Sequence, residues 1–483
     1  MSLRNLIKRI QDIMRKDVGV DGDAQRISQM VWIIFLKIFD AKEDEWEFAN
    51  SNYKTPLNDR LRWRNWAKDS EGMTGEDLLN FVNQDLFPSL KTLAEKEGVS
   101  AQGRVVGNMF SDAYNYMKSG TLLRQVINVI ESDLNFHSSE DRHIFNDIYE
   151  QILADLQSAG NAGEYYTPRA VTQFIVDMVD PKIGESILDP ACGTGGFLTC
   201  AINHLDPKST KDYGNLQKNI HGVEKKPLPH MLAVTNMMLH GIDTPVNIRL
   251  DNTLARPYIS YTDKDRKDII ITNPPFGGVE EDGIESNMPK KFQTRETADL
   301  FMALIMNLLK RDTGRAAVVL PDGFLFGEGV KTTIKEELLR DFNLHTIVRL
   351  PNGVFSPYTS IATNILFFER SAKGTKEIWF FEHPYPEGYK SYSRTRPLTI
   401  EEFDREKAWW NDRENSDFVE YAWKVSIDEI KAKNYNLDFK NPYIYEEHLE
   451  TPEALFAELT AINEAINKTQ AMLKAELMKA MEK

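Results

Sequence analysis

The sequence has few cysteines, no long apolar run and no low-complexity linker. Two cysteines in 483 residues, Cys192 and Cys200, cannot build a disulfide framework or a cysteine-rich zinc site, so we expect packing roles for both, no metal and a cytoplasmic protein. The longest apolar stretch, Met30–Phe39, is broken by Lys37 and is far shorter than the roughly 20 residues that span a bilayer. We therefore expect neither a membrane span nor a signal peptide.

The sequence also lacks an excess of basic residues. It holds 58 Lys and Arg against 73 Asp and Glu, which gives a formal net charge of −15. Because DNA affinity depends on clustered cations, such a chain is not expected to hold DNA unaided through a broad basic surface. If nucleic acid is the substrate, another component supplies much of the grip.

Hydrophobic periodicity divides the chain into three regions without internal repeats. In residues 1–156, apolar side chains such as Leu6 and Ile10 recur at helical spacing, which predicts a helical domain. Residues 157–445 alternate short apolar runs with helical patterns, which indicates an α/β domain whose mainly parallel sheet has helices on both faces. The last strand of that sheet is expected to end near Arg370.

Residues 446–483 carry apolar side chains at steps of three, four and seven among Glu and Lys, which predicts one or two amphipathic helices. These apolar positions are Leu455, Leu459, Ile462, Ile466, Leu473 and Leu477. Such a helix either packs on its own chain or binds a partner.

A glycine-rich turn lies in "ILDPACGTGGFL", from Ile187 to Leu198. A buried strand ends at Asp189, and a helix begins at Phe197 after the glycines. In an open α/β sheet this first turn is where a nucleotide-like ligand lies, because glycine lets the ligand approach the backbone. The spacing fits neither a dinucleotide site nor a P-loop, and Asp189 suits a cationic ammonium group. The alternative is a generic strand–turn–helix glycine cluster.

Polar side chains end the next three predicted strands. Glu224 is placed to bond the ribose hydroxyls of an adenosine ligand, and Asp251 could accept from an adenine amino group. Asn273 follows a fourth strand. A lone acid would be a solvated surface residue, but side chains at four successive strand ends indicate one ligand-binding edge.

The stretch "DIIITNPPFGG" sets an apolar strand directly against a stiff turn. Pro274 and Pro275 cannot extend the strand, because neither supplies a backbone N–H. The turn therefore presents an amide, Asn273, and an aromatic ring, Phe276. The alternative is an ordinary strand-ending turn in which Asn273 bonds its own backbone and Phe276 packs into the core.

Together, "DPACGTGGF" and "NPPF", preceded by "GEYYTPRAV" (Gly163–Val171), resemble the motifs of S-adenosylmethionine-dependent DNA adenine-N6 methyltransferases. More narrowly, the chain resembles the modification subunit of a type I restriction–modification system of bacteria or archaea. The resemblance covers nearly the whole chain. It implies a helical N-terminal domain, a Rossmann-like methyltransferase domain and a helical tail.

The resemblance also implies roles for individual residues. The Asn273 side-chain oxygen and the Pro274 carbonyl would accept from the target amino group within the Asn273-Pro274-Pro275-Phe276 turn, while Phe276 stacks on the extruded base. Asp189 would lie near the methionine ammonium of the cofactor and Asp251 near its adenine. The full set implied for S-adenosylmethionine is Glu164, Tyr165, Tyr166, Thr167, Pro168, Arg169, Asp189, Thr194, Gly195, Gly196, Glu224 and Asp251.

A target-recognition domain is missing after Arg370. In the type I family a separate specificity subunit recognises DNA, so the resemblance implies that partner, two copies of this chain per specificity subunit, and an optional restriction subunit. The tail helix would then have a partner. Candidate phosphate contacts on this chain are Lys290, Lys291, Arg295, Lys331 and Lys335.

Rival functions remain from the residues alone. An Asn-Pro-Pro turn also suits methylation of a protein glutamine or an RNA base, and a non-catalytic scaffold could retain the fold. A cytosine-C5 enzyme is disfavoured, because neither cysteine follows a proline as its nucleophile would.

Overall fold

The computed structural model describes residues 3–134, 167–278, 280–356, 359, 361–393, 395–443, 459–460, 462–464 and 466–474. The chain divides into two compact units, Met1–Phe439 and Lys440–Lys483. The domain boundaries expected at 156/157 and 445/446 stay predictions. Among the expected site residues, Glu164, Tyr165 and Tyr166 lie outside the described residues.

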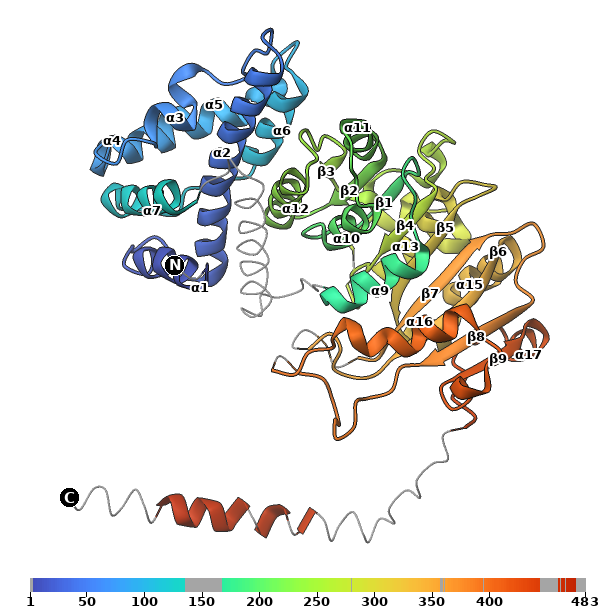
Figure 1. Cartoon of the computed structure of the whole chain (residues 1–483). Coiled ribbons are helices and arrows are strands. Elements are labelled where there is room, and N and C mark those ends of the chain that lie inside the picture. Colours follow the sequence, from blue (N-terminus) through green and yellow to red (C-terminus); the bar gives the residue numbers. More distant parts are fainter. Residues whose placement is uncertain are drawn as a thin grey trace. The chain divides into compact units, whose positions relative to one another are not determined.

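Helices build the N-terminal part of the first unit, as predicted (Figure 1). The long helix α2 (Asp23–Ala49) lies among the others, and its apolar run is buried on every side, which explains the absence of an amphipathic pattern there. Lys37 lies within this run, where its Nζ bonds the Glu131 carboxylate and burial lowers its pKa. The helices around α2 are α1 (Leu3–Met14), α3 (Trp63–Trp66), α4 (Gly75–Asn80), α5 (Phe87–Lys91), α6 (Ala101–Phe110) and α7 (Gly120–Asp133).

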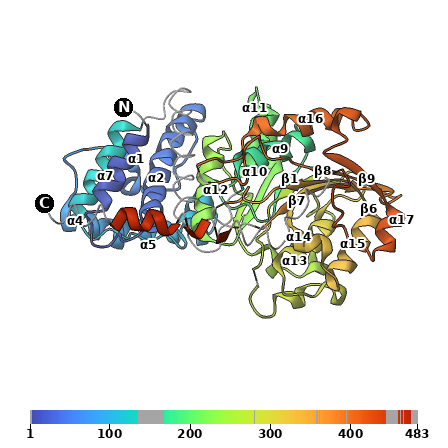
Figure 2. The same cartoon turned by 90° about the horizontal axis from the view of Figure 1, so that it is seen from below.

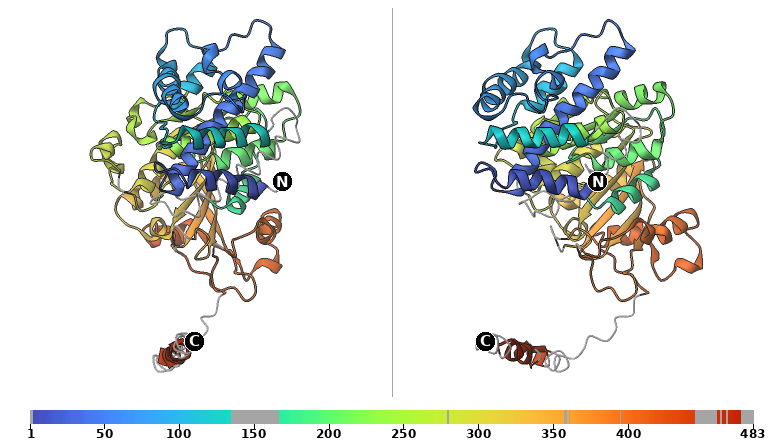
Figure 3. Two further views of the ribbon diagram at one scale, coloured as in Figure 1. Left: turned by 90° about the vertical axis from the view of Figure 1, so that its left-hand side faces the viewer. Right: turned by 60° about the vertical axis from the view of Figure 1, so that its left-hand side comes forward.

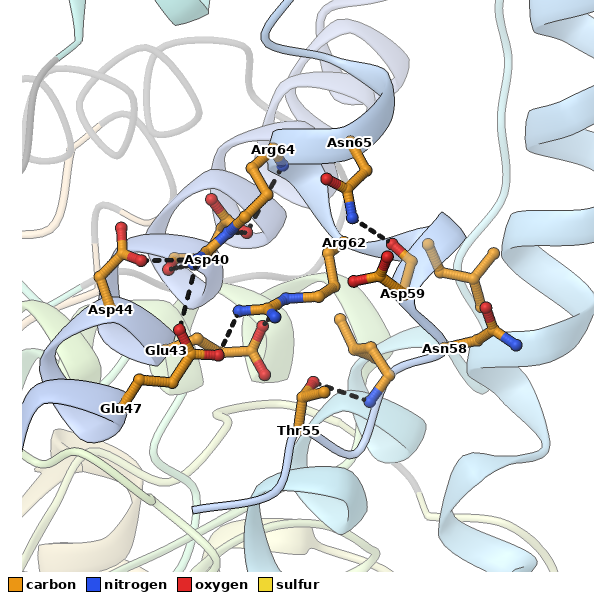
Figure 4. Close-up of polar contacts among 12 residues, drawn as sticks. Asp40, Glu43, Asp44, Glu47, Thr55, Asn58, Asp59, Arg62, Arg64 and Asn65 are labelled. Carbon is orange, nitrogen blue, oxygen red and sulfur yellow. Dashed lines mark hydrogen bonds and ion pairs between the residues drawn. The ribbon is translucent and has the colours of Figure 1, made fainter. Parts of the chain in front are cut away.

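Two arginines of the loop after α2 are held by the acids of that helix (Figure 4). Arg64 bonds Asp40 at 2.8 Å, and Arg62 lies 3.2 Å from the buried Glu43. Two further acids, Asp44 and Glu47, complete the cluster. These guanidinium groups therefore neutralise carboxylates of their own chain, which leaves them poorly suited to bind DNA phosphates.

A nine-stranded sheet forms the second part of this unit, in the order β3-β2-β1-β4-β5-β7-β6-β8-β9. The strands are β1 (Ile187–Asp189), β2 (Ile220–Glu224), β3 (Ile248–Leu250), β4 (Ile269–Thr272), β5 (Arg315–Pro321), β6 (Phe342–Leu350), β7 (Thr363–Arg370), β8 (Glu377–Glu382) and β9 (Ala422–Ser426). The first five strands in the order are parallel, and β7 runs antiparallel between β5 and β6. The predicted mainly parallel α/β sheet is confirmed.

Helices cover both faces of the sheet (Figure 2). On one face lie α9 (Arg169–Val179), α10 (Gly196–Leu205) and α16 (Asp404–Asn411), and on the other lie α13 (Thr297–Leu308), α14 (Asp322–Phe326) and α15 (Val330–Asp341). The remaining helices of this part are α11 (Thr210–Asn219), α12 (Pro227–Leu239) and α17 (Ile427–Ala432). Because α12 contacts α2 and α6 as well as β2 and β3, nearly its whole circumference is buried.

The sheet extends further than predicted, because β8 and β9 follow Arg370. We expected no strand there. The alternation of β8 is masked by its aromatic residues: Trp379 and Phe381 lie on one face and Phe380 on the other, with Phe380 stacked on Trp423 of β9 at 5.4 Å. A strand that is apolar on both faces loses the period-two signal that identifies it.

Two of the expected phosphate contacts are wrong. Lys331 is buried and pairs with Glu296 and, at 2.8 Å, with Asp299. Lys335 is fully buried, donates to two backbone carbonyls after α14, and has its pKa lowered to about 8 by that burial. Lys290, Lys291 and Arg295 are exposed and stay candidates.

The second unit contains helical residues at 459–460, 462–464 and 466–474 (Figure 3). A helical tail is therefore confirmed where the structure describes it. Leu459, Ile462 and Ile466 are 53%, 49% and 48% exposed, so this apolar stripe is open to a partner surface. Leu455 and Leu477 lie outside the described residues. In the described part of the chain, the helices are too short or too polar to cross a membrane.

Two glycines test the packing of the helical part against a matched control. A β-carbon on Gly107 of α6 would lie 2.4 Å from the Ala94 backbone nitrogen, whereas one on Gly214 of α11 would meet no heavy atom within 4 Å. We expect Gly107→Ala to destabilise the protein by about 1–3 kcal/mol through overpacking. Gly214→Ala should stabilise its helix by roughly 0.5–1 kcal/mol. Thermal unfolding followed by circular dichroism measures both, and equal melting temperatures for the two variants would contradict the packing described.

Candidate active site

The parallel strands β3, β2, β1 and β4 are neighbours, so their carboxyl ends meet at one edge of the sheet. A cavity of about 290 Å³ lies at this edge. It is lined by Gly193, Glu224, Asp251, Asn273 and Pro275 among other residues. The structure therefore brings together side chains that the sequence places at four separate strand ends, as is usual for ligand sites in open α/β sheets.

Glycine conformations open the turn after β1 to the cavity. Gly193 and Gly195 have φ values of 53° and 82°, in the left-handed region that disfavours other residues. No heavy atom lies within 4 Å of the position that a Gly193 β-carbon would take, so a ligand can approach the backbone there. Behind the turn, the Asn236 amide of α12 donates to the Thr194 carbonyl at 3.2 Å. The helix α10 then begins at Gly196.

Glu224 is held by the backbone on both sides. One carboxylate oxygen accepts from the Gly193 N–H at 2.9 Å, and the other accepts from the Lys226 N–H at 2.7 Å. Each oxygen has a second lone pair, so the carboxylate can still accept from a diol. The Asp251 N–H donates to the Glu224 carbonyl at 2.9 Å, which fixes the two acids side by side, and the Asp251 side chain is 51% exposed.

Asp189 lies beneath the cavity and is 1% exposed. Its Oδ1 accepts from the Thr272 hydroxyl at 2.7 Å and from the Ala191 N–H at 3.1 Å. Burial raises the pKa of this carboxyl to about 7, although both hydrogen bonds favour the ionised form. The structure thus shows Asp189 joining the ends of β1 and β4, a role that the sequence did not indicate.

Asn273 presents an acceptor that has no partner among the described residues. Its Nδ2 donates to the Thr167 hydroxyl at 2.9 Å, while Oδ1 is buried without a hydrogen bond there. An unsatisfied buried acceptor costs about 1–3 kcal/mol. The alternative in which Asn273 bonds its own backbone is not what the structure shows, and the oxygen is suited to receive an external donor.

Phe276 and Pro274 are buried. The Phe276 ring is 5% exposed and packs edge-to-face against Phe355, with ring centroids 6.2 Å apart. The core-packing alternative therefore describes this ring in the present structure. Stacking on an extruded base would require one face of the ring to be uncovered.

The segment before α9 contacts two parts of the site. Thr167 bonds Asn273, as described, and Pro168 precedes the first turn of α9. Arg169 donates to the Thr199 hydroxyl at 3.0 Å and to the Gly196 carbonyl at 3.4 Å, so it braces α10.

Sequence reasoning missed several residues around the cavity. Lys225, Asn252 and Thr253 directly follow singled-out acids, so their neighbours in sequence gave a usable signal. Glu280, Thr297 and Phe301 also line the cavity, from a loop and from α13 on the far side of the turn. Their sequence positions carry no comparable signal, because only the folded chain brings them to the strand ends.

Comparison with known families decides the assignment. A family model described as N-6 DNA Methylase matches residues 140–451. This chain belongs to the N-6 DNA methylase family. A second model, described as HsdM N-terminal domain, matches residues 3–130.

Relatives of this N-6 DNA methylase narrow the family further. It is 58% identical to the methylase subunit of the type I restriction enzyme EcoEI of Escherichia coli, over 99% of each chain. It is 28% identical to the EcoKI methylase subunit of Escherichia coli strain K12, over 85% of this chain and 78% of that one. The chain is thus a type I restriction enzyme methylase subunit, and the predicted family is confirmed.

Solved structures agree with this assignment. A modification subunit of a putative type I restriction enzyme from Vibrio vulnificus YJ016 is 43% identical, with a TM-score of 0.82 over 91% of this chain and 96% of that one. A chain from a study of complex assembly and conformational transition of the type I R-M system is 36% identical, with a TM-score of 0.81 over 99% and 98% of the two chains.

The buried carboxyl of Asp189 predicts a pH dependence of stability. Its pKa of about 7 in the folded protein exceeds the value of about 3.9 for an unfolded aspartate. The folded protein therefore keeps a proton that the unfolded chain releases, and this contribution to stability is lost as the pH rises from about 4 to about 7. Asp189→Asn stays neutral, so its melting temperature without ligand should fall less than that of the wild type between pH 5 and pH 8. The exposed Asp282→Asn variant is the control, and parallel pH curves for all three proteins would refute the effect.

Proposed function

We propose that this chain transfers the methyl group of S-adenosylmethionine to the N6 amino group of adenine in DNA. The observation that carries the proposal is the buried Asn273 Oδ1, an acceptor without a partner among the described residues, at a cavity shared with Glu224 and Asp251. An acceptor in this position suits a reaction whose target nitrogen carries N–H donors.

The residues present fit S-adenosylmethionine. The cavity of about 290 Å³ is close to the lower end of the range of roughly 300–1,000 Å³ for ligand pockets. Glu224 would accept from the ribose hydroxyls, Asp251 from the adenine amino group, and the open side of Gly193 would admit the ligand against the backbone. When bound, the cofactor supplies an electrophilic methyl group on sulfur. A nearby ammonium group would favour the ionised form of Asp189.

The Asn273 turn would prepare the target nitrogen. The lone pair of an adenine amino nitrogen is delocalised into the ring, and two acceptors on its N–H groups draw the nitrogen toward tetrahedral geometry. Asn273 Oδ1 and the Pro274 carbonyl would be these acceptors, positioned before reaction. Pro274 and Pro275 contribute no N–H, so no backbone donor of these two residues competes for the acceptors. Phe276 would offer its ring to the base once the base has left the duplex.

Two substitutions should separate cofactor binding from methyl transfer. We expect Glu224→Ala to weaken S-adenosylmethionine binding by about 1–3 kcal/mol, because it removes a charged hydrogen-bonding group. Asn273→Ala should leave that affinity unchanged and lower the methyl transfer rate by at least about 100-fold, the scale of a lost transition-state contact. Calorimetry measures the first effect, and incorporation of tritiated methyl groups into DNA measures the second.

Glu281→Ala is the matched control, because its side chain is 72% exposed and pairs with Lys225 outside the cavity. Unchanged cofactor affinity in Glu224→Ala, or methyl transfer near the wild-type rate in Asn273→Ala, would argue against these residue roles.

For assembly, we propose a specificity subunit that binds two copies of this chain, with an optional restriction subunit, in the cytoplasm of a bacterium or archaeon. The acidic charge of −15 and the internal pairing of Arg62, Arg64 and Lys331 leave few cations for DNA phosphates. The exposed stripe of Leu459, Ile462 and Ile466 supports a partner helix or groove. The full-length similarity to type I methylase subunits supports the same assembly.

The stripe variant Ile462→Asp with Ile466→Asp should lose co-purification with the specificity subunit, because two charges would be buried at the contact. Removal of all residues after Glu450 should have the same effect while cofactor binding remains. Glu464→Ala lies about 200° around the helix from Ile462 and serves as the control. An intact complex after either change would return the tail to packing on its own chain.

A further inference from the structure

A single hydrogen bond joins the segment before α9 to the catalytic turn. The Asn273 Nδ2 donates to the Thr167 hydroxyl at 2.9 Å, across 106 positions of sequence. No other side-chain bond of Asn273 is found among the described residues, where its Oδ1 is buried without a partner. The Thr167 hydroxyl is thus the contact that distinguishes the two ends of this amide.

The two ends of an amide have opposite hydrogen-bonding character. Its oxygen accepts, and its NH₂ group donates. A rotation of 180° about the last side-chain bond of Asn273 exchanges them with little change in shape. An adenine amino group presents N–H donors, so the rotated amide would set donor against donor at the reacting nitrogen. The orientation of the amide therefore decides whether Asn273 can act.

We propose that Thr167 is a positioning residue for methyl transfer, because its hydroxyl accepts from Asn273 Nδ2 and thereby turns Oδ1 toward the target amino group. This inference rests on the proposed function of Asn273 and extends it. It differs from the role that the family resemblance implies for Thr167, which is cofactor binding.

Thr167 is itself fixed by its neighbours. Two residues later, Arg169 donates to the Thr199 hydroxyl at 3.0 Å and to the Gly196 carbonyl at 3.4 Å. Between them, Pro168 has φ −54°, within the narrow range that its ring permits. The hydroxyl is therefore held relative to the first turn of α10, and the Asn273 amide is oriented relative to the glycine turn that α10 follows.

The test compares Thr167→Val, which has the same shape and no hydroxyl, with Thr167→Ser, which keeps the hydroxyl. Each is assembled with the specificity subunit and assayed by incorporation of tritiated methyl groups into DNA that contains the cognate site. We expect kcat of Thr167→Val to fall about 10-fold with KM for S-adenosylmethionine within twofold of the wild type. Thr167→Ser should recover at least half of the wild-type kcat. Thr235→Val, whose hydroxyl bonds only the Met231 carbonyl within α12, is the matched control.

A rise in KM for the cofactor with kcat unchanged would overturn the inference in favour of a cofactor-binding role. Wild-type kinetics in Thr167→Val would also overturn it. Fluorescence of 2-aminopurine at the target position should be the same in Thr167→Val and wild type, because base extrusion does not depend on the amide. A lost fluorescence signal would replace the positioning role with a role in base extrusion.

A second background guards against a folding defect. A carboxylate has an acceptor oxygen at either end, so Asn273→Asp needs no donor–acceptor orientation. In this background Thr167→Val should change the residual kcat less than twofold, and a full 10-fold loss there would contradict the inference. Asn273→Ala separates the two levels of proposal: if it retains activity, the proposed function of the turn fails, whereas if it is inactive and Thr167→Val is normal, only the positioning role fails.

Discussion

The parallel pairing of β1 with β4 is the constraint on which the candidate site depends. Ile187 and Leu188 pair with Ile269 and Ile270, so the two strands end at the same level. That register places the Thr272 hydroxyl 2.7 Å from the Asp189 carboxylate and sets Asn273 beside the glycine turn. A slip of one residue would reverse the faces of every side chain on β4 and separate the catalytic turn from the cavity. The remaining site contacts, including those of Glu224 and Thr167, are built on this alignment.

Charge is used mainly inside the molecule. The carboxylates of α2 hold Arg62 and Arg64, and Asp299 holds Lys331. Such pairs tie loops and helices together, and they are protected from the solvent screening that weakens exposed pairs. The chain therefore combines a negative total charge with few unpaired cations near the site. This distribution suits an enzyme that shares DNA binding with another subunit.

The sequence was most informative where chemistry and strand position coincide. Asp189, Glu224, Asp251 and Asn273 stand at strand ends, so one rule of α/β sheets predicted that they would meet, and the family and fold assignments are confirmed. It was least informative where contacts join distant segments. The Asn236 bond to the Thr194 carbonyl and the Thr167 bond to Asn273 leave no local pattern, since a single polar side chain reads as a surface residue. The same reason explains the error over Lys335, whose buried carbonyl partners appear only after folding.

The backbone contacts of Glu224 have a consequence for conformational entropy. A free glutamate side chain loses up to about 2 kcal/mol of rotamer freedom when it is fixed. In this protein the Gly193 and Lys226 N–H groups already fix it, so that loss belongs to folding. A ribose that arrives at the cavity meets an acceptor with a single orientation, and little of its binding free energy is consumed in ordering the receptor. The acid at the end of β2 therefore acts as a rigid part of the fold as well as a binding group.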